Sequence, residues 1–143
     1  MVDLKRRVEA EKENILRTQK DLKAVLSVEK KTNVELAAIA TFLLNIYNGM
    51  ENILKQILKS KGIKIHRSET WHKELLDVSV TQGLITDKLA NELREYLAFR
   101  HFFIHSYGFM LDEAHLKRLT DKVFDVWGDF SSRINEVLKG YKS

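Results

Sequence analysis

Residues 96–109, YLAFRHFFIHSYGF, bring an arginine, a histidine and a tyrosine closer together than any other part of the chain. Arg100 is followed after four residues by His105, and Tyr107 follows after one more. An arginine guanidinium is always cationic and pairs with phosphate oxygens, whereas an imidazole can accept and return a proton near neutral pH. The pair suits metal-independent cleavage of RNA, because the substrate's own 2′-hydroxyl is the nucleophile.

Helical geometry places these groups on different parts of one helix surface. At about 100° per residue, His105 lies about 140° from Arg100, and Tyr107 lies about 20° from it. Three aromatic residues lie on the opposite side of the helix: Phe99, Phe102 and Phe103. Arg100 and His105 therefore converge on one phosphate only if the helix end is distorted, which Gly108 permits, or if a second copy of the helix faces the first.

The composition of the 143-residue chain favours a single all-α domain over residues 1–143. The chain has no proline, and it is rich in leucine, lysine, glutamate and alanine, so we expect an up-and-down bundle of four or five helices. The segment 1–31 reads as an amphipathic helix that either packs on the bundle or contacts a partner subunit. The helices are predicted at about 2–30, 34–61, 69–82, 88–107 and 113–138.

Several classes of protein are disfavoured by the composition. There is no cysteine, which excludes disulfides and thiolate metal sites and fits a reducing compartment. The N-terminus lacks the apolar segment of a signal peptide, and no apolar run is long enough to span a bilayer. We therefore expect a cytoplasmic protein without a membrane partner. The net charge of +4 is compatible with RNA binding but does not require it.

The segment RHFFIHSY from Arg100 to Tyr107 resembles the R-x4-H-x-Y motif of HEPN-domain ribonuclease toxins, specifically the HepT-like group. The runs YNGMENILKQILKSKG, WHKELL and LREYLAFRHFFIHSYGFMLD are also similar to this group. The resemblance extends over roughly residues 35–140. It implies a helical bundle that pairs as a homodimer, so that two R-x4-H motifs line a shared cleft and cleave RNA without a metal or cofactor.

The resemblance also implies roles for particular residues and partners. Arg100 and His105 would be catalytic, acting on an RNA substrate such as tRNA or mRNA. HepT-like toxins are encoded beside a minimal nucleotidyltransferase antitoxin, which binds the toxin and adds AMP to the motif tyrosine, here Tyr107. An AMP group on that phenol would place bulk and negative charge next to Arg100 and block the seat of the RNA phosphate.

Other residues have a functional interpretation beside a structural one. His101 is predicted to support the site or contact substrate. Glu51, on the central helix, would orient Arg100 or His105 if it is buried, or would be a plain surface carboxylate. Neither His72 nor the other histidines outside the motif are expected to act, and no metal site is predicted. A basic patch either binds an RNA backbone or belongs to a loop that is simply solvated. Its residues are Lys59, Lys61, Lys64 and Arg67.

Three functions are therefore compatible with the chain. The first is an endoribonuclease toxin of a type II toxin–antitoxin pair, with an Arg/His site formed across a homodimer. The second is a non-catalytic helical binding module that partners a minimal nucleotidyltransferase. The third is a structural bundle that joins a larger assembly through its N-terminal helix.

Overall fold

A computed structural model describes residues 2–105 and 111–140, and all regular secondary structure in these residues is α-helical. The prediction of an all-α bundle is confirmed, with five helices in the described part of the chain. They are α1 (Val2–Leu26), α2 (Asn33–Ser60), α3 (Trp71–Thr81), α4 (Asp87–His105) and α5 (Glu113–Lys139). None of these helices is long and apolar enough to cross a membrane.

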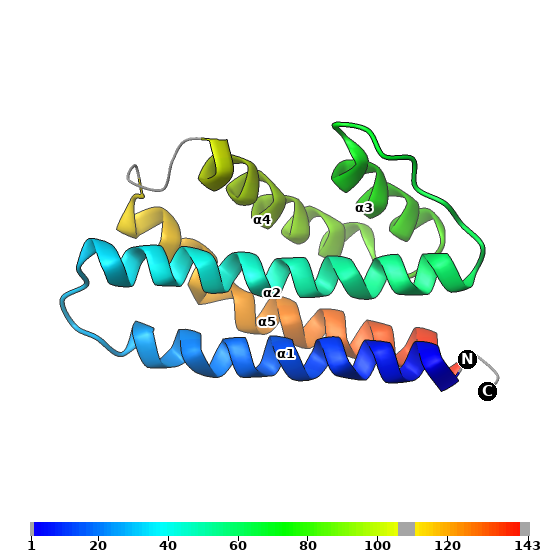
Figure 1. The fold of residues 1–143 in the computed structure, drawn as a ribbon, viewed down its shortest axis with the longest axis horizontal. Helices are drawn as coiled ribbons and strands as arrows, with labels where there is room; N and C mark the ends of the chain where they lie inside the picture. Colours follow the sequence, from blue (N-terminus) through cyan, green and yellow to red (C-terminus); the bar gives the residue numbers. More distant parts are fainter. Residues whose placement is uncertain (1, 106–110, 141–143) are drawn as a thin grey trace.

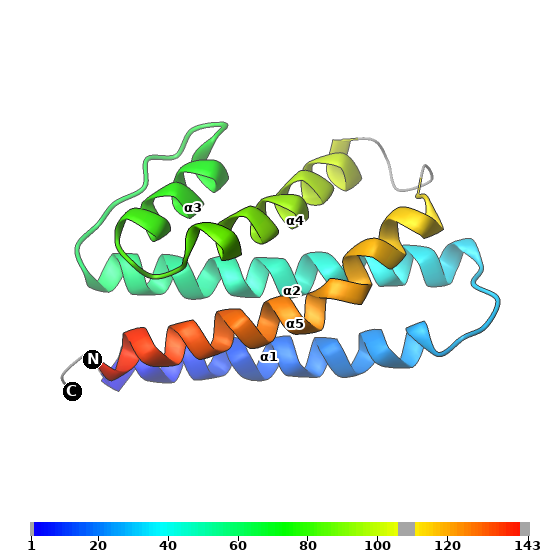
Figure 2. The same cartoon turned by 180° about the vertical axis from the view of Figure 1, so that it is seen from behind.

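The helices α1, α2 and α5 lie side by side, and α3 and α4 form a pair on the other side of α2 (Figures 1 and 2). The chain does not turn directly from the end of α2 into α3. Instead, residues 61–70 run back along α2, so that α3 begins above the middle of that helix and not at its end (Figure 1). This return places the start of α3 near α4.

Local capping explains where α2 and α5 begin and where α2 and α3 end. Thr32 and Glu35 form a reciprocal capping box at the start of α2, in which each side chain accepts a hydrogen bond from the other's backbone N–H. Asp112 Oδ1 accepts a hydrogen bond from the Ala114 N–H at the start of α5. Gly62 and Gly83 follow α2 and α3 with φ of 77° and 74°, a conformation that favours glycine.

Two predicted boundaries differ from the structure. The first helix ends at Leu26 rather than near residue 30, and α3 begins at Trp71 rather than at Glu69, with Thr70 as an N-cap residue that makes no side-chain capping bond. The predicted fourth helix extends to Tyr107, but only its part up to His105 lies within the described residues.

The first helix packs closely along α2 through Gly49. This residue is buried, and a Cβ atom built on it would lie only 2.5 Å from Ile15 Cγ1. The absence of a side chain therefore lets the two backbones approach each other, with Leu4, Val8 and Leu22 of α1 also buried. In the structure, the N-terminal helix is part of the bundle core.

The last turns of α4 are fixed on α5. The Tyr96 hydroxyl donates a 2.7 Å hydrogen bond to the Leu119 carbonyl of α5, and Phe99 is 2% exposed. The Phe99 ring packs against Phe103 at 6.1 Å between centroids and meets the His115 ring edge-on at 5.6 Å. The aromatic face predicted for α4 is thus the face that packs on the bundle. The opposite side of α4 therefore points outward.

Candidate active site

Four polar side chains from three helices form a connected series that ends at Arg100. The Tyr47 hydroxyl donates a 3.0 Å hydrogen bond to Glu51 Oε2, both on α2. The same carboxylate oxygen lies 2.7 Å from Nδ1 of His72 at the start of α3. The other ring nitrogen, His72 Nε2, lies 3.3 Å from Nη1 of Arg100 on α4. Glu51 is therefore linked to Arg100 through one imidazole.

The donors and acceptors of this series determine the tautomer of His72. A guanidinium has only N–H donors, so His72 Nε2 must accept from Arg100. The proton then resides on Nδ1, which donates to the carboxylate of Glu51. Glu51 is 4% exposed, and its charge is compensated by hydrogen bonds from Tyr47 and His72.

Burial also keeps Tyr47 in its donor form. Removal from water raises the pKa of the Tyr47 phenol above its ordinary value, and the nearby Glu51 charge and the hydrogen bond to it act in the same direction. The positive charge of Arg100 acts in the opposite direction but does not outweigh them. The phenol therefore remains protonated over the physiological pH range and keeps its hydrogen bond to the carboxylate.

The outer face of the α4 end carries two exposed histidines. The rings of His101 and His105, one turn apart, lie 4.4 Å apart between centroids and are tilted by 43°. Ile104 lies on the same outer side and is 48% exposed. Arg100 is half-buried and directed toward α3, and among the described residues no hydrogen bond joins it to His105. The angular separation expected from the sequence is thus present in the folded chain.

Of the two alternatives for Glu51, the structure shows the buried carboxylate and not the surface one. The expectation that His72 is incidental needs correction, because His72 contacts both Glu51 and Arg100. A sequence signal for Glu51 exists, because it occupies a helical row of otherwise apolar residues: Leu44, Tyr47, Leu54 and Leu58. No comparable signal marks His72, since its contact with Arg100 joins residues 28 positions apart.

The structure describes some of the remaining residues named in the sequence analysis and not others. Tyr107 lies outside the described residues. His115 packs against Phe99 and Phe102, whereas His66 is exposed in the segment between α2 and α3. In residues 2–105 and 111–140, no group of three or more histidines, cysteines, aspartates or glutamates is arranged to hold a metal ion.

A family model described as HepT-like protein matches residues 38–141. This range contains all four of the hydrogen-bonded side chains described above, from Tyr47 through Glu51 and His72 to Arg100. The protein belongs to the HepT-like family. One solved structure with a similar fold is that of the cytosolic protein of unknown function YutE from Bacillus subtilis. It has a TM-score of 0.65 and 18% sequence identity, with 92% of this chain and 95% of that chain covered, so the similarity concerns the fold. No curated protein matches this HepT-like chain.

Proposed function

We propose that this HepT-like protein is a metal-independent endoribonuclease and the toxin of a type II toxin–antitoxin pair. One observation carries the proposal. The Arg100 guanidinium is held by His72, while the rings of His101 and His105 are exposed on the adjoining face of the same helix. A fixed cation beside accessible imidazoles supplies a phosphate-binding group and a proton-transfer group.

The chemistry assigns a role to each of these groups. His105 removes the proton from the ribose 2′-hydroxyl, whose oxygen then bonds to the adjacent phosphorus while the bond from phosphorus to the 5′-oxygen breaks. Arg100 stabilises the negative charge that develops on the phosphate oxygens. The proton taken up by His105 is returned to the leaving 5′-oxygen, so one imidazole acts first as base and then as acid. The products are a 2′,3′-cyclic phosphate and a free 5′-hydroxyl, and no external nucleophile is consumed.

A homodimer would bring the separated groups together. Because Arg100 and His105 point about 140° apart on one helix, an isologous pair places the arginine of one copy opposite the histidine of the other. The exposed Ile104 lies between them on the helix surface, at about 40° from Arg100, where it would be covered by the second copy. His101 would then support the substrate at the shared cleft.

Control of the activity is assigned to a cognate nucleotidyltransferase antitoxin. This partner would bind the protein and attach AMP to Tyr107, which places a bulky anion near Arg100. We place the pair in the cytoplasm with its RNA substrate, tRNA or mRNA. The absence of cysteine and the description of the similar YutE as cytosolic support this location.

The test is an RNA-cleavage assay in EDTA with the full chain, using total tRNA and an mRNA transcript as substrates. The wild type should leave 2′,3′-cyclic phosphate ends, and Arg100→Ala and His105→Ala should each cleave at least about 100-fold more slowly. Arg17→Ala, which removes an exposed cation from α1, is the control and should cleave like the wild type. Equal cleavage by all four proteins, or by none, would contradict the proposal.

The same variants separate this proposal from its main alternative. A non-catalytic module that partners a nucleotidyltransferase would bind that partner while leaving RNA intact. In that case expression of the wild type would not arrest growth, and Arg100→Ala would change neither growth nor complex formation.

A further inference from the structure

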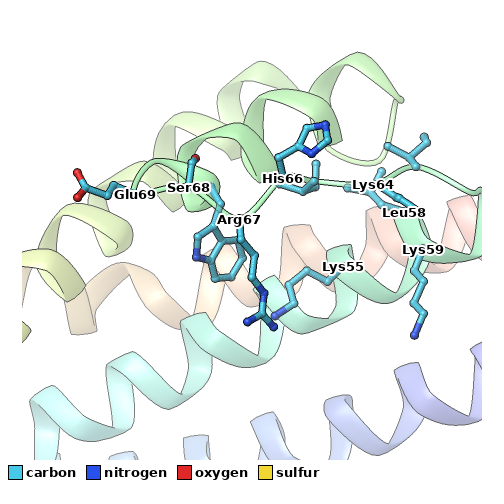
Figure 3. A pocket seen from close by; sticks show the side chains of 11 residues that line it. Lys55, Leu58, Lys59, Lys64, His66, Arg67, Ser68 and Glu69 are labelled. Atoms are coloured by element: carbon cyan, nitrogen blue, oxygen red, sulfur yellow. The ribbon is translucent and has the colours of Figure 1, made fainter.

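A basic groove lies beside the start of α3, between the C-terminal part of α2 and the segment 61–70. Its volume is about 980 Å³, and Figure 3 shows the side chains that line it. Four of them are cationic, and one, Glu69, is acidic. The cations come from both walls of the groove: Lys55, Lys59, Lys64 and Arg67.

The positive charge of this groove is only partly offset, by the one acidic residue Glu69. None of the ion pairs within 4 Å in the described residues involves any of the four cations. The ammonium of Lys55 lies 4.8 Å from the centre of the Trp71 ring, a cation–π contact that keeps it at the groove wall. The groove therefore presents several free cations to any anion that enters it.

The groove adjoins the candidate active site through two packed side chains of α3. Trp71 lines the groove, and its ring lies 3.6 Å, between centroids, from the ring of His72. His72 in turn contacts Arg100 at 3.3 Å. Only the first two side chains of α3 thus separate the groove from the guanidinium that would hold the scissile phosphate.

We propose that this groove binds the nucleotides of the RNA strand that flank the scissile phosphate, an inference that rests on the proposed ribonuclease function. The cations bind successive phosphates, and the partly exposed apolar residues of the lining, Ile63, Ile65 and Trp71, take the base. Such contacts do not read base edges, so the groove adds affinity with little sequence preference. An acidic protein surface is a poorer fit, because it would leave the apolar lining unused.

The experiment measures binding separately from cleavage. A fluorescently labelled 12-nucleotide RNA with 2′-O-methyl groups lacks the nucleophile, so its anisotropy reports affinity alone. In the double variant Lys55→Gln/Arg67→Gln, binding should weaken about tenfold, and the slope of log affinity against log salt should fall by about 1.4, or about 0.7 for each lost phosphate contact. Both residues are exposed, so the fold should be preserved.

The matched control is Lys20→Gln/Lys30→Gln. It removes the same charge from two exposed lysines outside the groove, one on α1 and one in the segment between α1 and α2. This control should bind the RNA within about twofold of the wild type, because it leaves the groove intact. Equal weakening in both double variants would overturn the proposal, since the effect would then come from net charge.

Further outcomes distinguish this proposal from the failure of the ribonuclease function. If Arg100→Ala abolishes cleavage and the Lys55→Gln/Arg67→Gln effect on binding persists in that background, the groove acts as inferred. If the wild type cleaves no RNA but binding still depends on the groove, the ribonuclease proposal fails and RNA binding by the groove stands. If the groove variant binds RNA normally and instead loses a nucleotidyltransferase partner, the groove is a protein-docking surface and the inference is wrong.

Discussion

His72 Nε2 lies 3.3 Å from Arg100 Nη1, and it is the one ring nitrogen of His72 that Glu51 does not hold. The contact links the start of α3 to the last turns of α4. Because the carboxylate of Glu51 is buried, the orientation of the imidazole is fixed from the core outward. The position of Arg100 therefore depends on a residue that is remote from it in sequence.

Replacing His72 should disturb the site more than the fold. His72→Ala leaves Glu51 with only the Tyr47 donor, at a cost of about 1–3 kcal/mol in the free energy of unfolding. RNA cleavage should fall between about 10- and 100-fold, because Arg100 loses its support. His72→Gln, whose amide oxygen can accept from Arg100, should recover part of the activity, measured as kcat and KM at a temperature where the variants are folded. Lys73→Ala, at the exposed neighbouring residue, is the control. An equal loss of RNA cleavage in Lys73→Ala would contradict the role of His72 in positioning Arg100.

The hydrogen bond from Tyr47 to Glu51 should contribute measurably to stability. Its acceptor is charged, so Tyr47→Phe should cost about 1.5–3 kcal/mol in urea unfolding. The matched substitution Tyr96→Phe removes a hydrogen bond to the neutral Leu119 carbonyl and should cost only about 0.5–1.5 kcal/mol. If Tyr96→Phe cost more than Tyr47→Phe, the hydrogen bond from Tyr47 to the Glu51 carboxylate would not have the expected stabilising effect.

The two buried tyrosines predict a loss of stability in alkali. Burial raises the pKa of both Tyr47 and Tyr96 above the ordinary value. Their phenols therefore stay protonated in the folded state, whereas in the unfolded state they ionise above about pH 10. Stability is fully present below that pH and falls as the pH rises above it, since the unfolded state then binds fewer protons. Tyr47→Phe should show a smaller fall than the wild type when unfolding is measured between about pH 8 and pH 11.

Mixing two inactive variants should restore activity if the site is shared between copies. In a dimer of Arg100→Ala with His105→Ala, one of the two sites combines an intact arginine with an intact histidine from opposite copies. An equal mixture contains about half mixed dimers, so cleavage should return to about a quarter of the wild-type rate. If the arginine and histidine of one site come from a single copy, the mixture should stay as inactive as its components.

Two helical glycines should respond in opposite directions to alanine. Gly49→Ala places a methyl group against Ile15 and should cost about 1–3 kcal/mol in urea unfolding, and less in an Ile15→Ala background. Gly128→Ala, on the exposed side of α5 with nothing within 4 Å of the new Cβ, should stabilise the protein by up to about 1 kcal/mol. Nothing in the structure explains why glycine occupies position 128. A stabilising effect of Gly49→Ala would refute the close approach of α1 to α2.

The amino-acid sequence by itself determined the helices and the spacing of the motif. Capping at Thr32 and Asp112 and the aromatic face around Phe99 depend on residues only a few positions apart, so they can be read from the chain directly. The separation of Arg100 from His105 also follows from helical geometry alone. The family resemblance was likewise carried by contiguous segments, and the match over residues 38–141 confirms it.

The tertiary structure decided which side chains surround Arg100. Glu51, His72 and Arg100 lie on three helices, and they meet only because residues 61–70 carry the chain back along α2 before α3 begins. The same return builds the basic groove against Trp71. Helical periodicity fixes the face on which a side chain lies, but not the neighbouring helix that this face meets, because that depends on the packing of the whole core.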